Sequence, residues 1–319
     1  MKGIKERGRV PLNVCLLLIF LACAAGGCWS RLEIEQMAFV SVVGVDRAGP
    51  QGVLVSFQVV VPRVLALRQG GAAGQGPPVV VTSVEARNVS EALARFSEVT
   101  PRGVRFKQLH AIVLGEDLAR QGVGPALDFF SRHWEVRRST WVLVAKGRAQ
   151  DVLVRGRPAL ERIPGTGIRF ILERRPAYTS TRFPVVLGDF LTALNSLGRE
   201  PVASSIEVYP MREAVSGGGS GGQGGAVAEG RGAEESKELA FKGAAVFRDD
   251  RLLDFLGPRE TRGVLWVQGK VKGGIINVPA PARGSWASLV VSGATTRVKP
   301  EVKKDRIRFR VEIKEEGFV

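Results

Sequence analysis

The sequence is short of the residues that build metal and disulfide sites. All three cysteines, Cys15, Cys23 and Cys28, lie within the first 28 residues, and the only histidines are His110 and His133. A disulfide within the rest of the chain is therefore excluded, and a zinc site of His and Cys has too few ligands. No spacing of acidic residues resembles a calcium-binding loop. We predict no cofactor and no metal site.

A long apolar run is also missing. The one strongly apolar stretch, Val14–Ala25, has twelve residues, whereas a transmembrane helix needs roughly 20. It follows a basic N-terminus and is followed by the small residues Gly26 and Gly27. This pattern is typical of a secretory signal peptide, which we place at residues 1–27.

The residue after this pattern is Cys28, as in bacterial lipoprotein signals, where such a cysteine is lipidated and becomes the first residue of the mature chain. We therefore predict Cys28 as the lipidation site. Cys23, after another small residue, is the alternative acceptor. An uncleaved signal anchor is the alternative to cleavage.

Acidic residues are outnumbered, since 46 Lys and Arg face 31 Asp and Glu and give a net charge of +15. Such a surface suits anionic lipid, an anionic polymer or nucleic acid, and a solvated Arg-rich surface is the simpler interpretation. Arg137 and Arg138 lie near Trp134 and Trp141, where they could stack on bases. No nucleic-acid motif is present, however, and the secretory signal argues against that partner, so we predict no nucleic-acid binding.

The body of the chain has alternating strand and helix patterns, which predict an α+β fold with mixed or antiparallel sheets and packed helices. Asn88 and Glu91 form a capping box that opens a helix. The expected strands in this half are 37–46, 53–62, 79–86, 104–114, 140–145 and 202–209; the expected helices are 90–99, 116–121, one from Pro125, a turn at 148–154, and 187–197.

The second half predicts further strands and a flexible segment. Ser216–Gly232 is almost entirely Gly, Ser, Ala and Gln and therefore predicts a flexible insertion. The expected strands are 239–247, 251–256, 264–271, 274–278, 286–291 and 307–313. We expect an N-terminal α+β domain at 28–156, a second, mostly β domain at 157–280, and the start of a truncated third α+β domain at 281–319.

Two segments resemble catalytic or phosphate-binding motifs, but each lacks a feature that its motif requires. Gly218–Gly222 matches G-x-S-x-G, but a low-complexity tract cannot supply the strained turn that exposes the serine. Gly263–Val271 approaches a phosphate-binding loop, but its glycines are one residue too far apart. His110 is predicted as a partly buried core residue within a strand, and Asp128 and Arg132 as an exposed ion pair. We therefore predict that the chain is not an enzyme.

A series of short segments, taken in order, carries a family resemblance. They are Gly27–Ile34, Met37–Asp46, Ser90–Ala92, Leu114–Ala119, Leu127–Phe129, Glu135–Arg137, Val144–Ala149, Phe241–Phe247 and Glu260–Trp266. As a set they resemble the Ger(x)C proteins, the lipoprotein C subunits of GerA-type nutrient germinant receptors in endospore-forming bacteria. Ser30 stands where the family commonly has Asp, and the chain stops inside what the family continues as a third domain.

The resemblance implies a role in spore germination. It implies a subunit anchored through Cys28 by fatty acyl chains such as palmitate to the outer face of the inner spore membrane. It also implies two polytopic membrane subunits as partners and no catalysis. An extracytoplasmic solute-binding lipoprotein is the alternative and predicts a deep pocket with convergent polar groups. A cell-wall hydrolase would need two carboxylates facing each other in a cleft.

Overall fold

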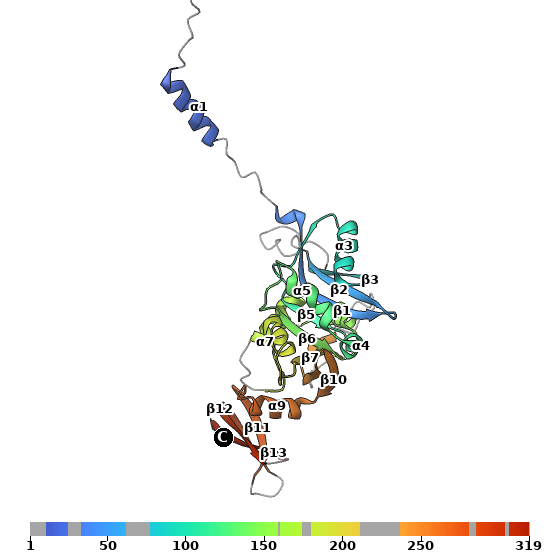
Figure 1. Ribbon diagram of the computed structural model, residues 1–319, viewed down its shortest axis with the longest axis vertical. Helices are drawn as coiled ribbons and strands as arrows, with labels where there is room; N and C mark the ends of the chain where they lie inside the picture. Colours follow the sequence, from blue (N-terminus) through green and yellow to red (C-terminus); the bar gives the residue numbers. More distant parts are fainter. Residues whose placement is uncertain are drawn as a thin grey trace, which may run out of the picture.

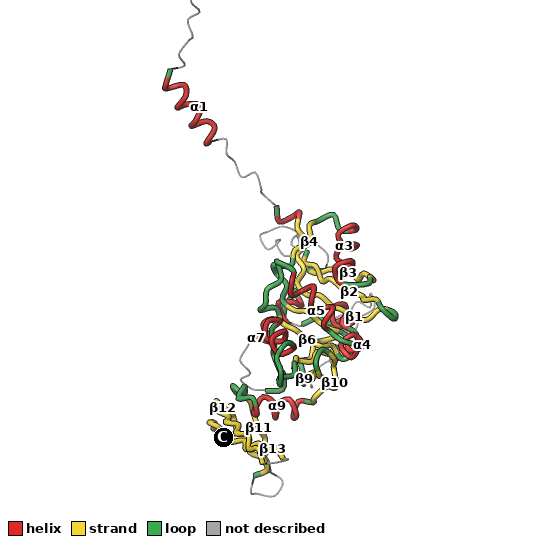
Figure 2. Tube along the Cα trace, in the orientation of Figure 1, coloured by secondary structure: helices red, strands yellow, loops and turns green. Residues whose placement is uncertain are grey.

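The computed structural model describes residues 11–24, 33–61, 77–158, 160–173, 180–210, 237–280, 285–303 and 306–318. Within these ranges the predicted α+β fold is confirmed: eight α-helices accompany one large mixed sheet and one three-stranded sheet (Figure 1). Figure 2 shows the large sheet and its helices as one body, with the small sheet beyond helix α9.

Strands of the large sheet come from both halves of the chain. Its order is β10-β9-β7-β6-β5-β1-β2-β3, with β4 paired to β1 and β8 paired to β7. Strands from both sides of residue 157 thus join one sheet, and the domain boundaries at residues 156 and 280 stay predictions. The strands are β1 (Met37–Ala48), β2 (Gly52–Val60), β3 (Val79–Ala86), β4 (Gly103–Arg105), β5 (Ala111–Leu114), β6 (Trp141–Ala145), β7 (Val202–Pro210), β8 (Lys237–Ala240), β9 (Ala244–Arg248) and β10 (Arg251–Leu256).

The centre of this sheet is parallel and buried on both faces. β1, β5, β6 and β7 run parallel, whereas β2 and β3 on one side and β9 and β10 on the other are antiparallel. Parallel strands covered on both faces read as continuous apolar runs, as Ala111–Leu114 and Trp141–Ala145 do. The turn between β1 and β2 contains Gly49 at φ 60°, where glycine is favoured.

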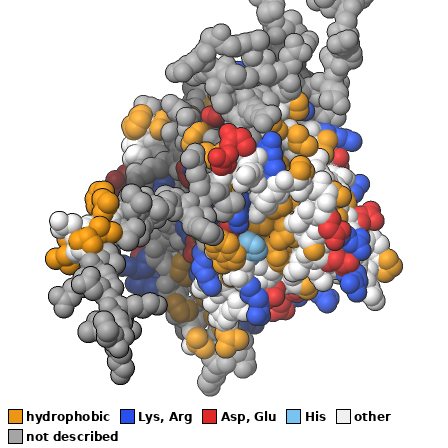
Figure 3. Space-filling model, turned by 90° about the horizontal axis from the view of Figure 1, so that it is seen from above, with side chains coloured by type: hydrophobic (Ala, Val, Ile, Leu, Met, Phe, Trp, Pro, Cys, Tyr) orange, Lys and Arg blue, Asp and Glu red, His pale blue; other side chains and the backbone are white. Residues whose placement is uncertain are grey.

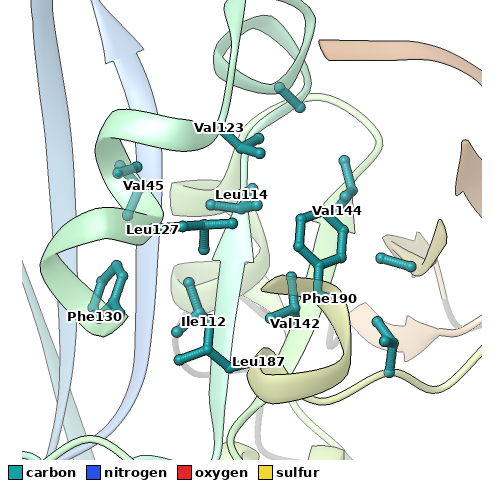
Figure 4. Packing of buried hydrophobic residues seen from close by; sticks show 14 of the residues in the cluster. Val45, Ile112, Leu114, Val123, Leu127, Phe130, Val142, Val144, Leu187 and Phe190 are labelled. Atoms are coloured by element: carbon teal, nitrogen blue, oxygen red, sulfur yellow. The ribbon is translucent and has the colours of Figure 1, made fainter. Parts of the chain in front are cut away.

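Helices cover both faces and create two cores. One face packs against α3 (Val89–Val99), α4 (Glu116–Gln121), α5 (Gly124–Arg132) and α8 (Leu187–Leu194). Figure 4 shows Leu127 and Phe130 of α5 beside Ile112, and Phe190 of α8 beside Val142 and Val144. The other face packs against α6 (Ala149–Arg155) and α7 (Pro164–Glu173), with Leu153 and Ile168 buried there.

The capping prediction at Asn88 is confirmed. Its side-chain Oδ1 accepts the backbone N–H of Glu91 at 2.9 Å, and α3 begins at the next residue, Val89. The strand predicted at 104–114 is wrong in its middle, because the chain leaves the sheet between β4 and β5. There the backbone N–H of Phe106 donates to the Glu135 carboxylate instead of a neighbouring strand.

Two helices were not predicted. α9 (Pro258–Val267) replaces the strand expected at 264–271, with Pro258 in its first turn and Leu265 buried. In a short apolar run the spacing of apolar residues does not separate a helix from a strand, so tertiary packing determines the helix here. The second helix is α7 (Pro164–Glu173), in a stretch for which the sequence predicts no element.

The small sheet follows α9 and has the order β11-β12-β13. Its strands are β11 (Gly274–Pro279), β12 (Trp286–Lys303) and β13 (Arg306–Phe318). Every residue of β13 is exposed. Its exposed apolar side chains include Ile307, Phe309 and Ile313.

Near the N-terminus, α1 (Leu12–Ala24) is a helix of 13 residues. Among the described residues, no helix has the length and apolarity required to cross a membrane. Cys28 and the Gly-rich stretch Ser216–Gly232 lie outside the described residues. The lipidation and insertion predictions therefore stay predictions.

Candidate functional site

Asp46, the acid near the end of β1, is buried, and both of its carboxylate oxygens accept backbone N–H groups. The N–H of Ala149 donates to its Oδ1 at 2.7 Å, and the N–H of Gln150 donates to its Oδ2 at 2.8 Å. A side chain at Gly115 would lie 2.0 Å from Oδ1, so glycine is required there. Burial raises the pKa of Asp46, and the two N–H donors oppose that rise. The carboxylate ties β1 to α6.

Glu135 has a similar structural role. Its buried carboxylate accepts the backbone N–H of Phe106 at 2.8 Å and lies 3.4 Å from Nη1 of Arg105. It therefore joins the segment after β4 to the segment after α5. The two buried acids hold backbone groups, and their arrangement is that of structural ties rather than of a catalytic pair.

His110 is partly buried, as predicted, but it precedes β5 instead of lying within a strand. Its backbone N–H donates to the carbonyl of Ser41 at 2.8 Å. Burial, with the nearby charges of Arg169 and Arg137, lowers its pKa to about 4. The imidazole is therefore neutral near pH 7. It borders a cavity of about 310 Å³ whose other lining residues are Phe39, Ser41, Val60, Gln108, Ile163 and Thr166.

The other candidates from the sequence are separate from His110. Asp128 and Arg132 form the predicted exposed ion pair, with Oδ1 and Nε 2.8 Å apart. Trp134 lies beyond the end of α5 and is exposed. Gly263 is inside α9, which rules out a phosphate loop there. Gly218–Gly222 lies outside the described residues.

Metal-binding groups are not brought together in the part of the chain that the structure describes: no three His, Cys, Asp or Glu side chains there share a site. The carboxylates on the helices are instead paired with arginines. The acids of the described helices mostly lie four residues from an arginine, as Glu91 and Arg95 do at 2.8 Å.

A cavity of about 320 Å³ was missed by the sequence analysis. It lies between α7, α8 and the segment after α9, and charges of both signs line it. The ammonium group of Lys270 is 4.5 Å from the centroid of the Phe183 ring. Burial lowers the pKa of Lys270 and that of Arg182, while Asp189 opposes the shift at Lys270. Its other lining residues are Leu172, Glu173, Ser180, Pro184, Leu265 and Lys272.

No local motif marks this cavity, because its residues come from four separate stretches. In the sequence, Lys270 stands only within the incomplete phosphate-loop pattern Gly263–Val271. A second hollow of about 660 Å³ lies between α9 and the small sheet, with Trp266 and Trp286 in its wall. The indole N–H of Trp266 is buried, and no acceptor for it is found among the described residues.

Comparisons with known proteins cover nearly the whole chain. A family model described as the spore germination protein N-terminal domain matches residues 30–208. A second model, described as spore germination B3/GerAC like, C-terminal, matches residues 242–319. Together they account for most of the described residues.

Individual proteins show the same likeness. Spore germination protein KC of Bacillus subtilis is 26% identical over 312 residues, which cover 96% of this chain and 74% of that protein. Spore germination protein B3 of the same organism is 25% identical over 306 residues, which cover 95% and 73%. The crystal structure of the GerBC protein is similar at 18% identity and a TM-score of 0.46, over 86% of this chain and 70% of that one.

Proposed function

The chain belongs to the Ger(x)C family of spore germination proteins, and from this premise we propose that it is a membrane-anchored subunit of a nutrient germinant receptor. It is held at the outer face of the inner spore membrane by lipid on Cys28. It works through contacts with two polytopic membrane subunits and not through catalysis.

The position of Cys28 carries this proposal. The family match begins at residue 30, two positions after Cys28, and the described domain begins at Glu33. A cysteine with a diacyl group and an amide-linked chain supplies the two or more acyl chains that stable anchoring requires. The folded domain then follows its anchor almost directly.

The chemistry of the described domain supports a non-catalytic role. Both buried carboxylates, those of Asp46 and Glu135, accept backbone N–H groups. The histidine with the strongest pKa shift, His110, borders a cavity whose other described lining residues carry no charge. A subunit of this kind acts by presenting surfaces to its partners.

Replacing the acceptor cysteine tests the anchor. We expect Cys28→Ala to leave the membrane fraction and to abolish germination by nutrients, because the chain loses its acyl chains. Cys23→Ala is the matched control and should leave both unchanged. A Cys28→Ala chain that stays lipidated, or a Cys23→Ala chain that is released, overturns the assignment of Cys28.

The partners are tested separately from the anchor. We expect the chain to co-purify in detergent with two multi-span membrane proteins, encoded beside it. Co-purification that persists after Cys28→Ala would show that protein contacts suffice for assembly. A chain that remains alone at all detergent concentrations contradicts the receptor role.

The cavity between α7 and α8 favours the second candidate function, a solute-binding lipoprotein. Its volume of about 320 Å³ falls at the lower end of the range typical of small-molecule sites. Lys270 and Arg182 suit a carboxylate, and Asp189 suits an amine, so an amino acid is the solute with matching chemistry.

Calorimetry distinguishes the two functions. Titration of the full chain with amino acids should show no binding if the chain acts only through its partners. Binding at micromolar to millimolar concentration that Lys270→Ala and Asp189→Asn both weaken at least tenfold would favour solute capture. Asp128→Asn, on the far exposed ion pair, is the control.

A further inference from the structure

The edge at which the chain enters the large sheet has an unusual set of exposed side chains. We call it the entry edge, made of residues 33–37, 99–107 and 132–138. The chain reaches β1 here through Glu33, and β4 pairs in parallel with the first residues of β1. α3 and α5 follow strands that end at the opposite side of the sheet, so both helices run back and finish at this edge.

Three large apolar side chains are exposed along the entry edge. Ile34 is 59% exposed, Val99 is 72% exposed and Trp134 is 76% exposed. Single exposed apolar residues are normal on a soluble surface, but three on one edge of a sheet, one of them a tryptophan, indicate a contact surface. Viewed from this side, hydrophobic side chains lie among Lys and Arg side chains on the described surface (Figure 3).

Trp134 is held in place for contact. Its ring is stacked on the His133 ring, with centroids 6.4 Å apart and an angle of 12° between the planes. The ammonium group of Lys107 lies 5.8 Å from the Trp134 ring centroid. Glu135 joins the two segments that carry Lys107 and Trp134, because it accepts from the N–H of Phe106 at 2.8 Å. The pair is therefore preorganised.

The tether determines what this edge can reach. Five peptide units separate Cys28 from Glu33, and an extended chain spans at most about 3.5 Å per residue. If Cys28 carries lipid, as the proposed function states, Glu33 lies within about 17 Å of the membrane surface. Among the surfaces described here, the entry edge is the one joined to the anchor most directly.

We infer that the entry edge rests on the surface of an anionic phospholipid bilayer, with Trp134 in the head-group layer. Tryptophan favours this layer because its ring is apolar and its N–H remains hydrated. Lys107, Arg102 and Arg137 face phosphate groups from the same edge. The inference rests on the proposed function and adds an orientation to it.

The apolar residues, more than charge, provide the attraction. The edge also carries Glu33 and Glu35, and both Arg132 and Arg105 are paired with acids. The net positive charge of the edge is therefore small. Salt should therefore weaken the binding of this edge to the membrane only in part, whereas it would largely abolish the binding of a purely basic patch.

Quenching by brominated lipid tests the contact. The full lipidated chain is reconstituted into vesicles of phosphatidylcholine and phosphatidylglycerol whose acyl chains carry bromine near the head group. In a Trp29→Phe background, which removes the indole beside the anchor, we expect Trp134→Phe to reduce the quenched fraction of tryptophan emission at least twofold. Trp286→Phe is the control, because Trp286 is 68% exposed but belongs to the small sheet, at the opposite end from the entry edge (Figure 1).

The outcomes distinguish a lipid bilayer from a protein partner at the entry edge. Equal quenching losses for Trp134→Phe and Trp286→Phe, in a chain that stays in the vesicles, overturn the inference and leave the anchor standing. A chain that leaves the vesicles overturns the anchor. Quenching of Trp134 that is lost on adding the polytopic subunits would assign this edge to a protein partner and likewise overturn the inference. Lys107→Ala should weaken quenching in anionic vesicles more than in pure phosphatidylcholine.

Discussion

The Oδ1 atom of Asp46 accepts the backbone N–H of Ala149 at 2.7 Å, although the two residues are 103 positions apart in the chain. The contact joins the end of the first strand to the first turn of α6. A carboxylate is favoured at a helix N-terminus, where N–H groups have no partner inside the helix. This side chain therefore links β1 to the first helix after β6.

Removing the Asp46 carboxylate should destabilise the fold. Asp46→Ala leaves the N–H groups of Ala149 and Gln150 without their acceptors, which costs about 2–4 kcal/mol in the free energy of unfolding. Urea denaturation of both chains measures the difference. Asp128→Ala, which removes an exposed acid, should change it by less than about 0.5 kcal/mol. Equal effects of the two variants would contradict the structural role of Asp46.

His110 should make the stability depend on pH. Burial lowers its pKa from 6.5 to about 4, so the folded protein disfavours the charged imidazolium. The unfolded chain binds a proton near pH 6.5 and the folded chain only near pH 4. Stability is therefore complete above pH 6.5 and is lost as the pH falls toward 4, by roughly 2–3 kcal/mol. Urea unfolding at pH 7 and pH 4 measures this.

His110→Gln provides the control for that slope. The variant has no titrating group at this position, so its loss of stability between pH 7 and pH 4 should be smaller than that of the original chain. An unchanged slope would assign the acid sensitivity to other groups. His133→Gln is a useful comparison, because burial also lowers the pKa of His133.

The rings of Phe57 and Phe96 should contribute strongly to the packing of α3. Their centroids are 4.6 Å apart with an interplanar angle of 8°, and both side chains are buried. Phe96→Ala should lower the free energy of unfolding by about 3–5 kcal/mol, through lost burial and a cavity. Val99→Ala, one turn further along the same helix and exposed, should cost less than about 0.5 kcal/mol. Thermal unfolding followed by circular dichroism measures both, and similar shifts would contradict the packing assignment.

The sequence predicted those elements whose signals are local. The strand before Asp46 is a β-branched run, and the cap at Asn88 is a short-range hydrogen bond, so both are encoded in neighbouring residues. The helix at Pro258–Val267 was misread because its apolar run has no period that separates strand from helix. Its packing depends on β12 and β13, which lie later in the chain.

The site features were less accessible to sequence analysis. Lys107 and Trp134 are 27 positions apart and meet only because Glu135 joins their segments. The Lys270 cavity likewise collects residues from separate elements. Only the small residues before Cys28 form a contiguous pattern, and that is why the sequence alone predicts an anchor but no contact surface.

The long hairpin of β12 and β13 should make the chain self-associate. Cross-strand pairing places Val298 opposite Val311 and Val302 opposite Ile307, so the exposed apolar side chains gather on one face. β13 is also an edge strand of 13 residues, and unpaired edges of this kind pair with other chains.

Sedimentation velocity should show association that increases with protein concentration. Phe309→Lys, on the apolar face, should lower the association constant at least tenfold, because it places a charge in the contact. Arg308→Ala, one residue away on the opposite face, should leave the constant within about twofold. Association that responds equally to both variants would place the contact on another surface of the protein.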